Sequence, residues 1–125
     1  MNEERSTPVE LQHRTKEFAL RVIRLFSRLP ETTVAQTIGK QVLRSGTSAG
    51  ANYREACRAR STPEFISKLG IVAQELEETL YWMELLIEAE IVAEHLLQPL
   101  MTAADELLAI VTASTLTAKR RTTTE

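Results

Sequence analysis

The sequence is poor in the residues that build disulfides, loops and sheets. Its 125 residues include one cysteine, four glycines and four prolines, and only 5% are aromatic. The single cysteine, Cys57, excludes an internal disulfide, which fits a reducing compartment. So few glycines and prolines argue against a loop-rich or all-β chain. The hydrophobic fraction is 43%, mainly Leu, Ile, Val and Ala, and it predicts an aliphatic core built from helices.

Long hydrophobic runs are also missing. The polar N-terminus, MNEERSTPVE, lacks the apolar segment of a secretory signal. By inspection, no apolar run reaches the roughly 18 residues that a membrane span needs. We therefore expect a cytoplasmic protein with no membrane partner.

Charge is divided unevenly along the chain. Residues 1–60 carry eleven Lys or Arg against six Asp or Glu, whereas residues 61–125 carry four against eleven. The net charge of −2 thus hides a basic half and an acidic half. Two interpretations stay open: one face of the protein meets a polyanion, or basic and acidic helices neighbour each other.

Hydrophobic periodicity predicts four helices, at about residues 7–29, 33–60, 63–90 and 92–118. Thr7-Pro8 and Ser61-Thr62-Pro63-Glu64 are typical of helix starts, since a hydroxyl caps the helix and proline fits its first turn. Short connections favour an antiparallel up-and-down four-helix bundle. We expect residues 1–6 and the basic tail 119–125 to be disordered.

Polar residues stand where the helix at 33–60 is expected to face its neighbours. We call them, with their predicted counterparts on the helix at 63–90, the polar seam. Its members are Arg44, Ser48, Asn52 and Glu55, facing Glu75, Glu78 and Trp82. One interpretation is a network that fixes helix register, with an Arg–carboxylate fork and Asn52 bridging helices. The other is a pocket for a small polar or anionic ligand.

Arginines form a second group of candidate residues. Arg14, Arg21 and Arg28 recur every seven residues with Arg24 nearby, and Arg54, Arg58 and Arg60 end the second helix. Such surfaces suit phosphate groups and predict a nucleic-acid contact. A solvated charged face is the alternative interpretation.

Apolar residues beside the main stripe of the first helix exceed what one bundle seam requires. Ala19, Ile23 and Phe26 lie there, and a second surface of small or aromatic residues includes Tyr53 on the next helix. We predict that these four residues form an oligomer interface.

The sequence contains no complete catalytic or metal-binding motif. Glu10-x-x-His13 matches half of a di-iron motif, but His95 has no glutamate three residues before it. The sequence also lacks a phosphate-binding loop, a nucleophile elbow and zinc-ligand spacing. We predict no catalytic residue, no metal and no cofactor.

Four segments together resemble a known family. They are Leu29-Pro30, the run Gln41–Ala56 (QVLRSGTSAGANYREA), Ser61–Phe65 (STPEF), and Glu75-x-x-Glu78-Thr79-x-Tyr81-Trp82. The chain resembles, over about Phe18 to Lys119, the four-helix-bundle proteins encoded within 23S rRNA intervening sequences. The resemblance implies a closed bundle that assembles as a ring-shaped homopentamer.

A related group, the accessory variability determinants of diversity-generating retroelements, resembles this family in fold. Resemblance to that group implies that the chain binds nucleic acid and associates with a reverse transcriptase. Those proteins are basic, whereas this chain is mildly acidic. The first hypothesis is therefore a non-enzymatic homo-oligomeric adaptor for RNA, DNA, a reverse transcriptase or another protein. The second is a ligand or enzymatic site in the polar seam, and the third is a structural protein–protein scaffold.

Overall fold

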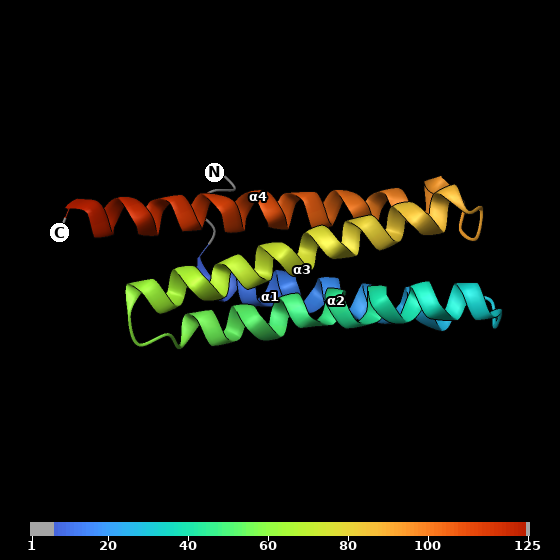
Figure 1. Ribbon diagram of the computed structural model, residues 1–125, viewed down its shortest axis with the longest axis horizontal. Helices are drawn as coiled ribbons and strands as arrows, with labels where there is room; N and C mark the ends of the chain where they lie inside the picture. The colour runs from blue at the N-terminus through green and yellow to red at the C-terminus, as the bar shows by residue number, and fades with distance from the viewer. Residues whose placement is uncertain (1–6, 125) are drawn as a thin grey trace.

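The computed structural model describes residues 7–124, which form four α-helices and no β-strand. The helices are α1 (Pro8–Ser27), α2 (Thr33–Cys57), α3 (Thr62–Glu88) and α4 (Glu94–Thr124). They pack lengthwise against one another (Figure 1). The all-α, four-helix prediction is confirmed for this part of the chain. Residues 1–6, predicted to be disordered, lie outside the described residues.

Side-chain oxygens cap the first three helices where the sequence places hydroxyl residues. The Thr7, Thr32 and Ser61 hydroxyls accept hydrogen bonds from backbone N–H groups three residues later, at 3.1–3.2 Å. Glu64 also reaches back, and its carboxylate accepts a bond from the Arg60 N–H at 2.6 Å. These bonds satisfy donors that a helix start leaves without partners, so local sequence fixes where the helices begin.

The connection between α3 and α4 is a tight helix-ending turn. Glu90 has φ 59°, and the N–H groups of Glu90 and Ile91 donate to the carbonyls of Ile87 and Leu86, both at 2.9 Å. This is a Schellman motif, with glutamate at the position where glycine is usual. The turn brings Ile91 and Val92 back against the bundle and delays α4 to Glu94, two residues after the predicted start.

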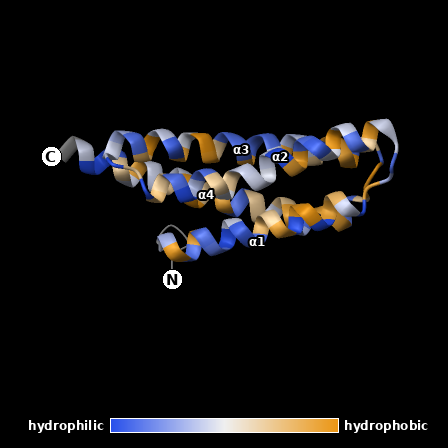
Figure 2. Cartoon of the chain, turned by 90° about the horizontal axis from the view of Figure 1, so that it is seen from below, coloured by the Kyte–Doolittle hydropathy of each residue, from blue (hydrophilic) through white to orange (hydrophobic). Residues whose placement is uncertain are grey.

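An aliphatic core runs the length of the molecule. Apolar residues gather where the helices face one another (Figure 2). Residues that repeat at helical spacing on α1, α3 and α4 supply most of it. Fully buried members include Leu11, Phe18, Val22, Leu69, Val72, Leu76, Met83, Leu97, Leu107 and Val111.

Glycines let α1 approach α2 closely. A Cβ atom placed on Gly46 would lie 2.8 Å from a methyl carbon of buried Val22. One on Gly39 would collide with Leu29 and lie 3.1 Å from the Phe26 ring. These glycines therefore allow tight packing between α1 and α2, and that packing fixes the rotation of α2.

That rotation corrects the expected role of the α2 surface that includes Tyr53, which was predicted to contact another subunit. The small-residue stripe faces the core, with Val42, Gly46, Ala49, Tyr53 and Ala56 buried. Arg44 and Glu55 of the polar seam lie along the edge of α2 that packs on α3. The small residues face the interior because α1 can approach α2 closely only where α2 has small side chains.

The last helix is longer and more apolar than expected. Residues 119–124, predicted to be a disordered tail, continue α4, whose last turns extend beyond the other helices (Figure 1). Within Glu94–Thr122, an 18-residue window has mean hydropathy 1.3 and is 33% buried. In length and composition this helix would suffice to cross a membrane, which corrects the expectation that no stretch does. The core helix of a soluble protein meets the same criterion.

Candidate functional site

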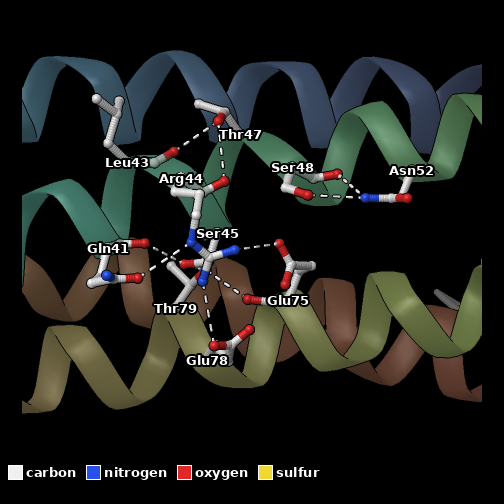
Figure 3. A network of polar contacts seen from close by, with 10 residues as sticks. All are labelled: Gln41, Leu43, Arg44, Ser45, Thr47, Ser48, Asn52, Glu75, Glu78 and Thr79. Carbon is white, nitrogen blue, oxygen red and sulfur yellow. Dashed lines mark hydrogen bonds and ion pairs between the residues drawn. The ribbon is translucent and has the colours of Figure 1, made fainter.

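The centre of the polar seam is a guanidinium held between two carboxylates. Arg44 on α2 donates from Nη1 to Glu75 Oε2 at 3.2 Å and from Nη2 to Glu78 Oε1 at 3.3 Å. Its Nε donates to Gln41 Oε1 at 3.2 Å. Figure 3 shows these groups converging between the two helices. Arg44 thus links two carboxylates by single bonds, rather than forming the expected two-bond fork with one.

The two carboxylates differ in how far they are removed from water. The exposed fraction of the side chain is 11% for Glu75 and 40% for Glu78, and Arg44 itself is half exposed. A buried carboxylate depends on its partner far more than a solvated one does. Glu75 is therefore the member of the seam that needs Arg44 most.

The other predicted seam members do not join this network. Asn52 donates to the Ser48 carbonyl and hydroxyl oxygens, both at 2.9 Å, within α2 (Figure 3). The prediction that Asn52 bridges helices is not supported by any of these bonds. Glu55 accepts a 2.6 Å bond from Lys68 on α3, an ion pair that sequence reasoning missed. That bond also raises the pKa of Lys68.

Beneath the ion pairs, a neutral hydrogen bond joins the same helices. The Thr79 hydroxyl lies 2.7 Å from the Ser45 hydroxyl and 2.7 Å from the Glu75 carbonyl, and both side chains are buried. Together, the pairs 45–79, 44–75 and 55–68 define which residues of α2 and α3 lie against each other. Ser45 and Thr79 are polar residues at positions where helical spacing favours contact with a neighbouring helix, and this pattern in the sequence could have indicated the bond.

Trp82 occupies the same edge of α3 without a polar partner. Its indole Nε1 is buried and has no hydrogen-bond partner among the described residues. Its ring meets Tyr81 edge-on, with centroids 5.0 Å apart. Trp82 therefore contributes packing, and the structure does not place it in the Arg44 network.

The predicted arginine surface divides into two patches and one ion pair. Arg14 pairs with Glu106 on α4 at 3.3 Å. The patch on the C-terminal half of α1 comprises Arg21, Arg24 and Arg28, and the patch at the end of α2 comprises Arg54, Arg58 and Arg60. Their side chains make no hydrogen bond or ion pair with residues 7–124. The two patches lie toward opposite ends of the molecule (Figure 1).

Three of the four predicted interface residues remain accessible. Ile23 is 43% exposed, whereas Ala19 and Phe26 are half-buried, with Phe26 packed toward Gly39. The fourth, Tyr53, is only 4% exposed and belongs to the core of the chain itself. The prediction that Tyr53 contacts another subunit was therefore wrong. The close approach of α1 turns the side of α2 that carries Tyr53 toward the core.

The buried Tyr53 phenol is the most perturbed titratable group of the described chain. Burial raises its pKa strongly, and the neighbouring Cys57 side chain adds to the shift. Cys57 itself is exposed. Among residues 7–124 there is no group of three His, Cys, Asp or Glu that could hold a metal ion.

These features define an all-α protein in which charged residues pair across helices and six arginines make no ion pair with residues 7–124. A family model for the 23S rRNA-intervening sequence protein matches residues 8–113, and the chain belongs to that family. It is also similar to a crystal structure from Bacteroides thetaiotaomicron, described as a protein with unknown function from the S23 ribosomal protein family. The two share 35% sequence identity with a TM-score of 0.81, covering 86% of this chain and 96% of that one. None of the curated proteins compared with the chain matches it.

Proposed function

We propose that the protein is a non-enzymatic, cytoplasmic subunit of a homo-oligomer that binds RNA or DNA through its arginine patches. The observation that carries the proposal is the set of six arginines without an acidic partner in the described chain. By contrast, Arg14, Arg44 and Lys68 each pair with a carboxylate on a neighbouring helix. Unpaired guanidiniums on a chain of net negative charge favour a role for these residues outside the subunit.

The subunit in this proposal is an antiparallel up-and-down bundle. Support comes from the short connections and from the reversal of the chain at each of them (Figure 1). The α2–α3 register, set by Arg44 and Lys68, fits the same topology. In this arrangement both ends of the bundle carry an arginine patch.

The assembled state in this proposal is the ring-shaped homopentamer that the family resemblance implies. Apolar side chains that stay exposed on the subunit support further association. They include Ile23, Val34 and Leu116. A ring would repeat each arginine patch five times around one axis, so weak contacts would add through valency.

The polar seam is assigned a structural role in this proposal. Arg44, Glu75 and Glu78 are paired with one another, and Glu55 is paired with Lys68. Such a pattern favours a device that fixes helix register over a pocket awaiting a polar ligand. A reverse transcriptase or another protein stays the proposed additional partner of an adaptor.

The test is salt-dependent binding of a structured RNA, measured by fluorescence anisotropy on the intact oligomer. We expect binding at low salt that weakens steeply as salt rises, because phosphate contacts release counterions. Replacing Arg54, Arg58 and Arg60 with glutamine should reduce the slope of log K against log salt by about one unit per lost contact.

Lys40→Gln provides the matched control, since Lys40 is an exposed cation on the same helix. It should leave the slope near that of the natural protein. Absence of any anisotropy change at low salt, with the oligomer intact, would rule out nucleic-acid binding.

A further inference from the structure

A cavity opens where the C-terminal end of α1 meets the start of α4. Its volume is about 400 Å³. The α1–α4 interface is the least extensive of the four helix interfaces, so the bundle is least closed along this side. The cavity lies at the end of the bundle where the α1–α2 and α3–α4 connections also contribute to its wall.

The interior of this cavity is apolar. Buried Leu29, Leu97 and Leu100 form its floor, and they belong to the core of the bundle. Half-buried Leu25 and Val92 form its walls, the latter held there by the turn that ends α3. A ligand in this space would replace water on aliphatic surface, at roughly 25 cal/mol for each Å² buried.

The rim of the cavity is cationic. Arg21, Arg24 and Arg28 line it from α1, and no carboxylate of residues 7–124 pairs with them. Arg14, two turns earlier on α1, shows the contrast, because Glu106 on α4 neutralises it. Among the described residues, none that line this cavity is acidic, although the second half of the chain is acidic overall.

We propose that this cavity binds an anionic amphiphile of the single-chain carboxylate class, with its hydrocarbon chain inside and its carboxylate at the arginine rim. The volume falls within the range of small-molecule sites, which are mostly apolar with a few orienting polar groups. Guanidinium groups match a carboxylate in both charge and geometry. The argument needs neither oligomerisation nor nucleic-acid binding.

Two other occupants fit the interior of the cavity less well. A phosphate backbone would use the arginines and leave the aliphatic floor uncovered. An extended amphipathic helix needs a long groove, whereas this cavity is bounded by two chain connections. A short flexible hydrocarbon chain suits the bounded shape.

The experiment is titration calorimetry of the intact protein with decanoate, kept below the micelle-forming concentration. Decanol and decyltrimethylammonium serve as neutral and cationic probes of the same chain length. We expect one saturable decanoate site per chain, about tenfold tighter than either probe because charge-assisted hydrogen bonds fix the carboxylate.

Variants separate the rim from the interior. Arg24→Gln with Arg28→Gln should weaken decanoate binding about tenfold and bring it level with decanol. The matched control, Arg54→Gln with Arg58→Gln, should leave decanoate binding unchanged. Leu25→Trp, which fills the cavity and keeps every arginine, should abolish it, with thermal melting used to verify that the variant folds.

Three results would overturn the proposal. They are equal affinity for all three probes, no saturable decanoate binding, and an acidic amphipathic peptide that binds this surface where decanoate does not. The RNA measurement is independent of all three. Loss of RNA binding with decanoate binding retained would refute the proposed function and leave this site standing.

Discussion

At the scale of single residues, Gly46 controls how closely α1 and α2 approach. A β-carbon there would lie 2.8–3.3 Å from three carbons of Val22, which is fully buried and branched. We expect Gly46→Ala to lower the free energy of unfolding by about 1–3 kcal/mol, because overpacking outweighs the gain in helix propensity. Thermal unfolding should show a lower Tm, by about 4 °C per kcal/mol.

Gly70→Ala is the matched control for that substitution. Gly70 is an exposed helical residue, and a Cβ there would meet nothing within 4 Å. Alanine should therefore raise stability by about 1 kcal/mol through helix propensity alone. If both variants shift the Tm in the same direction, close packing at Gly46 is not the controlling factor.

Tyr53 predicts a loss of stability in alkaline solution. The native state raises the pKa of its phenol, so the folded chain holds the proton more tightly than the unfolded chain does. The free energy of unfolding should therefore fall as pH rises above about 10, where an unfolded tyrosine ionises. Denaturant unfolding at about pH 8 and about pH 11 measures this change.

Tyr53→Phe should make that alkaline loss smaller, since it removes the buried phenol and keeps the ring. Tyr81→Phe, which removes an exposed phenol on α3, is the control and should retain the loss seen in the natural protein. An unchanged pH dependence in Tyr53→Phe would show that another group causes it.

At the scale of helices, the α2–α3 pair depends unequally on the two carboxylates that Arg44 contacts. We expect a coupling energy of about 1–2 kcal/mol between Arg44 and Glu75, but below about 1 kcal/mol between Arg44 and Glu78. The couplings differ because water screens an exposed ion pair more than a buried one. The Glu75 side chain is 11% exposed, whereas that of Glu78 is 40% exposed.

Double-mutant cycles with glutamine at the three positions measure both couplings by denaturant unfolding. The Lys68–Glu55 pair, on the same two helices, supplies a reference for an exposed ion pair. Equal couplings to Glu75 and Glu78 would contradict the dependence on burial.

At the scale of the whole molecule, the exposed apolar side chains of α1 predict self-association. Light scattering should give a mass near five times that of the 14.1-kDa chain if the ring proposal is correct. Ile23→Glu should shift the mass toward the monomer, because it places a charge in the proposed contact. Ile71→Glu changes an exposed residue of α3 outside that surface and should keep the assembled mass.

A monomer mass for the natural protein would remove the oligomer from the proposal. It would leave the arginine patches and the amphiphile cavity unaffected, because both are defined by one chain. The predictions for single residues, for the helix pair and for the oligomer can thus be tested separately.

The sequence by itself determined where three helices start and that apolar residues recur along each helix at helical spacing. Those features are local: hydroxyl caps bond three residues ahead, and apolar side chains repeat at the period of one helix. Continuation of α4 to Thr124 escaped prediction, since a basic run without an apolar face carries no periodic signal.

Only the tertiary structure decided which stripe of α2 became the interior. Gly39 and Gly46 leave room for the side chains of Val22, Phe26 and Leu29 on α1 and the loop after it. This contact sets the rotation of α2, so that Tyr53 faces the core and the polar seam faces α3. The same packing paired Arg14 and Arg44 and left other arginines around an apolar cavity. Helix rotation is set by neighbouring helices together, so no single periodicity in the sequence could have fixed it.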